Sequence, residues 1–187
     1  SSFSTDRLSL NVSGAGRQIV LSAATGSITV DTTDFAANTA NDHFTFETPA
    51  GGVSFEAGTL TAASVTIDAL TAVTRSGAAT SDIDTTAVNG AVSITADGGI
   101  GSSTNPLRVK AGQGLVEATT ITGSIWITSP DIRLGEIVTG SGSQTVSIEG
   151  TSSLQVVASS TTDDDWRLTS NGIITLVGSV MLEASVF

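Results

Sequence analysis

The amino-acid sequence predicts an all-β protein and, within that class, a parallel β-helix, also called a β-solenoid. Many short runs alternate between aliphatic and polar residues, which is the period of a half-buried strand. Glycine and proline separate these runs at short intervals. Runs of about three to five residues are too short for a good flat sheet. They can instead pair with their copies one turn above in a stack of coils.

Residues 90–134 carry this pattern most clearly. Turn residues such as Gly98-Gly99, Asn105-Pro106 and Pro130 divide the region, and proline is expected outside the strands because it cannot donate a ladder hydrogen bond. The alternating segments between the turns are 92–95, 107–109, 115–117, 125–127 and 132–134. We expect each of them to be a short strand of one coil.

Composition supports a single solenoid segment that occupies residues 1–187. Few strong helix formers occur, whereas valine, isoleucine and threonine are abundant, so we expect almost no helix. The strand count predicts about seven or eight coils, and the absence of a strict hexapeptide repeat favours a right-handed winding. A β-sandwich is the alternative fold, although the runs are shorter than typical sandwich strands. Disorder is disfavoured by the 39% apolar content.

The charge balance excludes some classes of partner. Lysine and arginine total 7 against 18 aspartates and glutamates, which gives a net charge of −11. Such a surface repels nucleic acid, and no apolar run is long enough for insertion into a membrane. Cysteine is absent, which is compatible with secretion.

Strand-like segments lie close to both ends, at 8–12 and 180–182, and no amphipathic capping helix is visible. An isolated solenoid normally needs polar caps on its end coils. We therefore expect a portion of a longer protein, with neighbouring coils or like subunits joined end to end.

The alternation also predicts the core. In each aliphatic–polar–aliphatic triplet the two aliphatic side chains should point inward. The expected inward residues are Ile28, Val30, Phe44, Phe46, Val53, Phe55, Val65, Ile67, Val92, Ile94, Ile125, Ile127, Val146, Ile148, Ile174 and Leu176. Two stretches, 31–43 and 74–90, look like polar excursions from the coil, the second with Ile83 and Val88 as anchors.

One stretch resembles a known family. Residues 98–109, GGIGSSTNPLRV, followed by 123–127, GSIWI, are similar to the repeats of filamentous-haemagglutinin-like bacterial adhesins, in which a G-x-I-G-S…N-P-L turn precedes a G-x-I-x-I strand. The resemblance is specific over about residues 98–134. It implies a right-handed parallel β-helix shaft of a large secreted or cell-surface protein with roles in adhesion or matrix.

Candidate catalytic residues are few. His43, the only histidine, lies beside Asp42, but a lone loop histidine is mostly solvated. Asp82 and Asp84 would share one face of an extended strand, and paired carboxylates serve some β-helix enzymes that cleave polysaccharides. Only Arg75 lies near them in the sequence, so we expect a solvated loop and no catalysis.

Two kinds of residue could bind a ligand. The acidic residues Asp31, Asp34, Asp163, Asp164 and Asp165 could supply oxygen ligands to Ca²⁺, although they match no established calcium-binding loop. Trp126 and Trp166, the only tryptophans, are expected to point outward, where they could contact carbohydrate, a host surface or a neighbouring chain.

The predicted function is a non-catalytic structural shaft or filament segment of a secreted or cell-surface bacterial adhesin or an extracellular matrix fibre. The alternative is a carbohydrate-active β-helix enzyme, a polysaccharide lyase or hydrolase. A weaker alternative is binding to an ordered surface such as ice or crystalline polysaccharide. That activity would require the outward threonines Thr29, Thr45, Thr66 and Thr95 to align.

Overall fold

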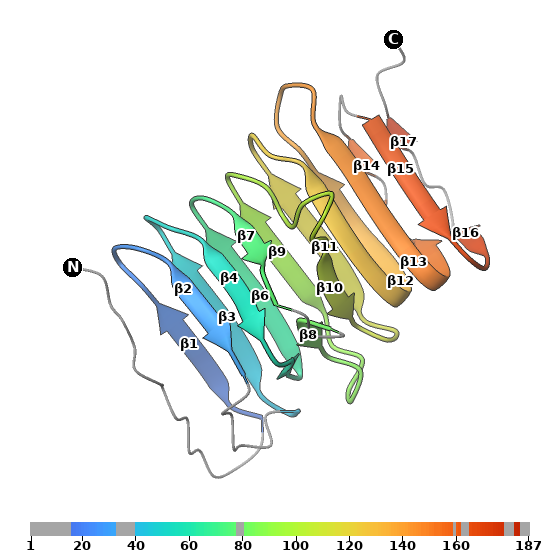
Figure 1. Cartoon of the computed structure of the whole chain (residues 1–187). Coiled ribbons are helices and arrows are strands. Elements are labelled where there is room, and N and C mark those ends of the chain that lie inside the picture. Colours follow the sequence, from blue (N-terminus) through green and yellow to red (C-terminus); the bar gives the residue numbers. More distant parts are fainter. Residues whose placement is uncertain are drawn as a thin grey trace.

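The chain winds into a parallel β-solenoid of about 7 turns (Figure 1). The computed structural model describes residues 16–32, 40–77, 81–158, 160–161, 165–177 and 182–183. Over these residues the structure contains no helix, and every strand pair is parallel. The fold class predicted from the alternation is therefore confirmed. The β-sandwich alternative is wrong, because consecutive strands of a sandwich would pair antiparallel. The right-handed winding stays a prediction.

The strands lie on three faces, although not every coil has a strand on the third. The first face contains β1 (Gln18–Ser22), β3 (His43–Thr48), β6 (Ser64–Ala69), β9 (Val92–Ala96), β11 (Leu115–Thr120), the ends of β12 (Ile125–Val138) and β13 (Thr145–Val156), and β16 (Ile174–Leu176). The second contains β2 (Ile28–Asp31), β4 (Val53–Ala57), β7 (Val73–Arg75), the beginnings of β12 and β13, and β15 (Asp165–Ser170). The third contains β5 (Leu60–Thr61), β8 (Ile83–Asp84) and β10 (Leu107–Lys110), and β14 (Ser160–Thr161) pairs with β17 (Leu182–Glu183).

The length of a coil varies although the stack stays in register. Val65 pairs with Val92, 27 residues later, whereas Val116 pairs with Leu134, only 18 residues later. The longer coil includes β8 on the third face, whereas after Val116 the single strand β12 runs from the second face directly into the next coil of the first face. The inward columns therefore remain continuous without a fixed sequence repeat.

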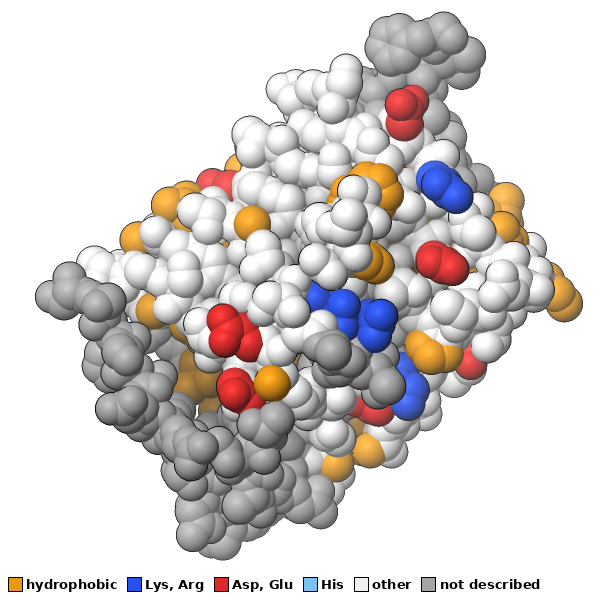
Figure 2. Space-filling view, viewed as in Figure 1, with side chains coloured by type: hydrophobic (Ala, Val, Ile, Leu, Met, Phe, Trp, Pro, Cys, Tyr) orange, Lys and Arg blue, Asp and Glu red, His pale blue; other side chains and the backbone are white. Residues whose placement is uncertain are grey.

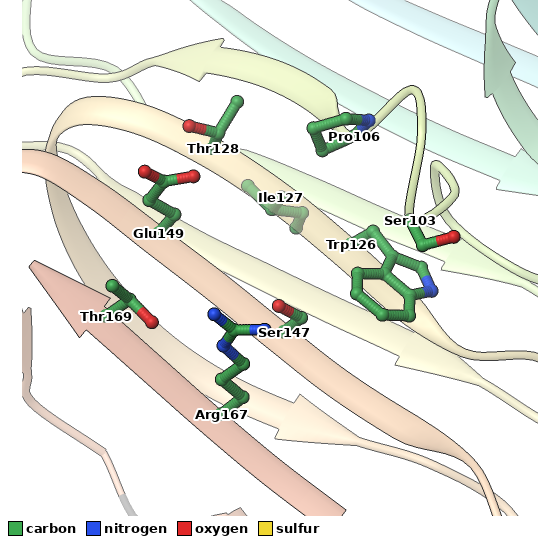
Figure 3. Close-up of a pocket in the computed structure, with 9 residues that line it drawn as sticks. All are labelled: Ser103, Pro106, Trp126, Ile127, Thr128, Ser147, Glu149, Arg167 and Thr169. Carbon is green, nitrogen blue, oxygen red and sulfur yellow. The ribbon is translucent and has the colours of Figure 1, made fainter.

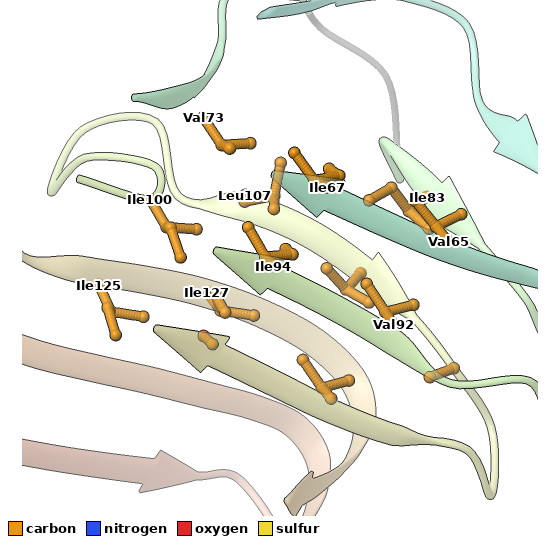
Figure 4. Packing of buried hydrophobic residues seen from close by; sticks show 14 of the residues in the cluster. Val65, Ile67, Val73, Ile83, Val92, Ile94, Ile100, Leu107, Ile125 and Ile127 are labelled. Carbon is orange, nitrogen blue, oxygen red and sulfur yellow. The ribbon is translucent and has the colours of Figure 1, made fainter. Parts of the chain in front are cut away.

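The inward columns form one hydrophobic core along the stack. Figure 4 shows the middle coils, where Val65 lies over Val92 in one column and Ile67 lies over Ile94 in the next. Of the predicted core residues, all are at most 4% exposed except Ile28, Ile174 and Leu176. Ile28 is partly buried against the core. Ile174 and Leu176 share the inward columns but are exposed, because they lie on the last described strand of the first face.

Near the first coils the core is aromatic. The rings of Phe44 and Phe46 are stacked with centroids 6.1 Å apart, and Phe46 meets Phe55 edge to face at 6.4 Å. Offset and edge-to-face pairs are favoured arrangements for aromatic rings. In the later coils aliphatic residues occupy the corresponding columns, for example Ile67 and Ile94 after Phe46.

Pro130 does not interrupt its strand, contrary to the expectation from the sequence. β12 runs through it as one strand of 14 residues, and β13 is also long, with 12 residues. The register against β13 shifts between Ser129 and Asp131, and Pro130 itself is exposed. Pro130 is thus tolerated at an irregularity where the ladder needs no donor from it.

The stretch 74–90 is less of an excursion than its polarity suggests. Arg75 ends β7, residues 83–84 form β8, and Ile83 is fully buried, so the anchor predicted at Ile83 is confirmed. The anchor predicted at Val88 is wrong, because this side chain is 47% exposed in the turn that follows β8. In the stretch 31–43, residues 33–39 lie outside the described residues, as do residues 8–12 and 180–181 near the chain ends.

Glycine is required at Gly123, where the backbones of two coils approach closely. A Cβ atom at Gly123 would lie 2.2 Å from the backbone nitrogen of Gly99 and 2.4 Å from the carbonyl carbon of Gly98. Both contacts belong to the backbone of the preceding coil, which cannot move aside as a side chain can. The lack of a side chain at Gly123 therefore allows the turn before residues 125–127 to pack directly against the backbone of the turn below it.

Candidate functional site

The carboxylate of Asp82 is buried and fully occupied by partners. It accepts a hydrogen bond at Oδ1 from Nε of Arg75 at 3.0 Å, and at Oδ2 from the backbone N–H of Arg108 at 2.8 Å. The Asp82 and Arg75 side chains are 2% and 4% exposed. Burial raises the pKa of Asp82, and this effect outweighs the hydrogen bonds from Arg108 and Arg75, which lower it. The expected solvated loop is therefore wrong at this residue.

Asp84 lies on the same strand and also has a basic partner. Nζ of Lys110 is 3.4 Å from its Oδ2, and the backbone N–H of Thr86 donates to its Oδ1 at 3.0 Å. Burial alone would raise the pKa of Asp84, but the hydrogen bonds from Thr86 and the charge of Lys110 lower it on balance. In the sequence only Arg75 lies nearby, whereas the stacking of β8 on β10 adds Arg108 and Lys110. The charges of Asp84 and Lys110 neutralise each other across two coils.

His43 faces outward at the edge of the first face. Its Nδ1 lies 2.7 Å from Oγ of Ser64, its register partner on the next coil. The preceding residue, Asp42, does not complete a Ser-His-Asp arrangement, because its carboxylate is bound to Arg17. The contact between His43 and Ser64 is one that sequence reasoning missed. It could have been found only from the register, in which 21 residues separate the pair.

The calcium candidates are not brought together within the described structure. Asp31 and Asp165 belong to β2 and β15, and both are exposed. Asp34, Asp163 and Asp164 lie outside the described residues. Among the residues that the structure does describe, no three or more side chains of His, Cys, Asp or Glu are grouped as a metal site would require. Calcium binding stays a prediction.

The outward threonines do not form one array on the described strands. Thr45 and Thr66 are register partners, but the next position of that column is Ser93. Thr95 belongs to another column, and Thr29 lies on the second face. The geometry therefore offers no regular threonine lattice to support the ordered-surface alternative.

A shallow hollow of about 190 Å³ lies on the outer side of the second face (Figure 3). Its floor consists of outward columns in three successive strands: Trp126 of β12 aligns with Ser147 and Arg167, and Thr128 aligns with Glu149 and Thr169. One wall is the loop 101–106. The lining residues are Ser103, Pro106, Trp126, Ile127, Thr128, Ser147, Glu149, Arg167 and Thr169.

The loop 101–106 leaves the coil without disturbing the stack. Ile100 bridges to Ile125, and Leu107 pairs with Ile127, so both flanking residues keep their places in the core. Within the loop, the N–H of Asn105 donates to Oγ of Ser102 at 3.0 Å. The segments that carry the adhesin resemblance, 98–109 and 123–127, therefore also supply the loop and the tryptophan of the hollow.

The two tryptophans have opposite orientations. Trp126 is half-buried and points outward into the hollow, as predicted (Figure 3). The prediction for Trp166 is wrong: it is the register partner of the inward Val146 and packs against the core together with Leu168. Residues 166 and 168 are two apart on one strand, so they share a face, and that face is the core side. Only Trp126 remains a candidate for an outward contact.

The rest of the visible surface is mostly neutral and polar. Figure 2 shows small groups of acidic and basic side chains next to one another rather than a broad patch of one sign. In the described part of the chain there is no helix that could cross a membrane. No protein-family model, curated protein or solved structure matches this chain. The description that the structure supports is thus a parallel β-solenoid with an outward hollow beside Trp126.

Proposed function

We propose that the chain is a non-catalytic shaft segment of a secreted or cell-surface bacterial adhesin or of an extracellular matrix fibre. One continuous core runs through the coils, and the candidate acids bind to bases of the protein itself. The stacking of Ile100 on Ile125 agrees with the adhesin-like turn and strand occupying successive coils. These features support a rod that acts as a spacer between, or a support for, other domains of the adhesin or fibre.

The observation that carries the proposal is an unfinished apolar stack. Ile174 and Leu176 are the register partners of Leu154 and Val156, which are at most 1% exposed. Ile174 and Leu176 themselves are 45% and 55% exposed. Both side chains continue the inward columns of the first face on the last strand of that face that the structure describes. An open strand edge with apolar side chains favours pairing with more strand.

We call the exposed side of β16 with Ile174 and Leu176 the joining surface. In the native state we expect it to be covered by further solenoid, either of the same polypeptide or of another copy joined end to end. A head-to-tail contact of this kind does not close on itself, so it builds a filament. The net charge of −11 opposes lateral clumping, which favours axial growth. Neighbouring coils or like subunits are therefore the proposed partners.

The experiment compares the chain with a double variant, Ile174→Asp with Leu176→Asp. Sedimentation velocity over a range of concentrations should show association of the original chain, and electron microscopy should show short rods. The double variant should remain monomeric, because charges would occupy the joining surface. The matched control is Ile121→Asp, a change at a side chain in a turn of the middle coils that is 52% exposed, which should associate normally. A monomeric original chain at high concentration would contradict the proposal.

A carbohydrate-active enzyme is the second candidate, because the structure places cations of Arg75, Arg108 and Lys110 around Asp82 and Asp84 more closely than the sequence suggested. Paired carboxylates near cations suit the cleavage of acidic polysaccharides. The hydrogen bonds already made by both carboxylates argue against it. The substrate screen described in the Discussion separates the two.

A further inference from the structure

We propose that the hollow beside Trp126 binds one or two rings of an uncharged glycan. This inference does not depend on the shaft being part of an adhesin, and a shaft could lack the site. It rests on the composition of the hollow, its dimensions and the absence of partners for its charged side chains among the residues that the structure describes.

The hollow combines an aromatic surface with hydrogen-bonding groups. Figure 3 shows the indole of Trp126 seen flat on, with Ser103 at its edge and Ser147 and Arg167 beyond it. An indole face can stack on the C–H face of a sugar ring, while its N–H can donate to a hydroxyl. Ser103, Thr128, Ser147 and Thr169 place hydroxyl groups around the same space.

The charged groups of the hollow are available to a ligand. Within the described part of the chain, neither the guanidinium of Arg167 nor the carboxylate of Glu149 has a side-chain hydrogen bond or ion pair. One is a donor and the other an acceptor, which matches the two roles of a sugar hydroxyl. Their charges cancel, and the chain carries −11 overall, so a polyanion would be repelled. An uncharged sugar fits this balance.

The dimensions limit the ligand to a short unit. Trp126 and Arg167 are two strands apart in the stack, or about 10 Å along the rod at ordinary strand spacing. The volume of about 190 Å³ is below the range of about 300–1,000 Å³ typical of enclosed ligand pockets. The hollow can therefore hold one or two rings and leave the remainder of an oligosaccharide in solvent.

Tryptophan fluorescence provides a direct test. Trp166→Phe leaves Trp126 as the only fluorophore, and this protein is titrated with cellotetraose, maltotetraose and mannotetraose, with oligogalacturonate as the anionic comparison. At least one neutral tetrasaccharide should give a saturable change in emission, and oligogalacturonate should give none. No saturable change with any neutral probe, or a change with oligogalacturonate alone, would overturn the proposal.

Variants identify the residues that act. By calorimetry on the full chain, Trp126→Ala should weaken binding of the selected tetrasaccharide about tenfold or more, whereas Trp126→Phe should retain much of it. Arg167→Gln and Glu149→Gln, both at exposed positions, should each weaken binding severalfold without altering the fold. Thr66→Ala, at an exposed position on the first face, is the control and should bind normally. Unchanged binding in Trp126→Ala, Arg167→Gln and Glu149→Gln would overturn the assignment. So would a loss of self-association in Trp126→Ala with no effect on sugar, because the face would then be a protein contact.

Discussion

The carboxylate of Asp42 is completely buried, and Arg17 of the preceding coil binds it through both its backbone and its side chain. Oδ1 accepts hydrogen bonds from the backbone N–H at 3.1 Å and from Nε at 2.9 Å, and a terminal guanidinium nitrogen pairs with Oδ2. Hydrogen bonding from Arg17 lowers the pKa of Asp42, against the effect of burial. This pair joins two coils at one edge of the stack, and it links stability to pH.

A lowered folded-state pKa fixes the sign of that link. The stabilisation from Asp42 is fully present above the ordinary aspartate pKa of about 3.9 and is lost as the pH falls through the lower folded-state pKa. Asp42→Asn should therefore lower the urea midpoint at pH 7, and its deficit against the original chain should shrink towards pH 2. Urea unfolding at a series of pH values measures this. A deficit that is the same at every pH would contradict the role of the charge.

The orientation of the core columns predicts that substitutions at inward positions reduce the unfolding free energy more than substitutions at outward positions. Ile127→Ala removes a side chain that is 1% exposed and should cost roughly 2 to 5 kcal/mol of unfolding free energy. Thr95→Ala changes an exposed position and should cost less than about 0.5 kcal/mol. Equal losses in chemical denaturation would reject the assigned inward and outward sides.

Two glycines test the close approach of neighbouring turns. Gly123→Ala forces a methyl group against the backbone of Gly98 and Gly99 and should cost about 1–3 kcal/mol or more. At Gly135 the new methyl would meet only the flexible side chain of Glu117, at 2.5 Å, which can move aside. Thermal unfolding should therefore show a clear drop for Gly123→Ala and little change for Gly135→Ala. The reverse order would show that the stacking of turns is not limited by backbone contact.

The non-catalytic proposal predicts no turnover of pectin, alginate, chitin or glucan. Both carboxylates of the Asp82 and Asp84 pair already bind to the protein's own donors, so neither is poised to transfer a proton to a substrate. Reducing-sugar and unsaturated-product assays would detect hydrolysis and elimination. Cleavage that disappears in both Asp82→Asn and Asp84→Asn would establish the enzyme alternative.

Local alternation was sufficient to predict the sides of most strands. Val92 and Ile94, for example, are two residues apart in a run with a polar residue between them, and both are buried. The same rule would have placed Trp166 on the side of Leu168. The inward orientation of Trp166 was therefore predictable from the alternation alone.

Contacts between coils could not be predicted in this way. Asp84 and Lys110 are 26 residues apart, whereas His43 and Ser64 are 21 apart, because the coils differ in length. Without a fixed repeat, the sequence does not say which residues are neighbours along the rod. The hydrogen bond from the backbone N–H of Arg108 to Asp82 and the hollow beside Trp126 both depend on that register.

The direction of strand pairing also has a mechanical consequence. The backbone hydrogen bonds between coils, such as the one from the N–H of Trp126 to the carbonyl of Ile100 at 2.7 Å, link one coil to the next along the rod. A pull on the two chain ends would therefore act along these bonds and would enter an end coil at a single point, so the bonds nearest that point would break first. Extension would proceed one coil after another from the ends, and each released coil would add a length of slack polypeptide before the next junction gave way.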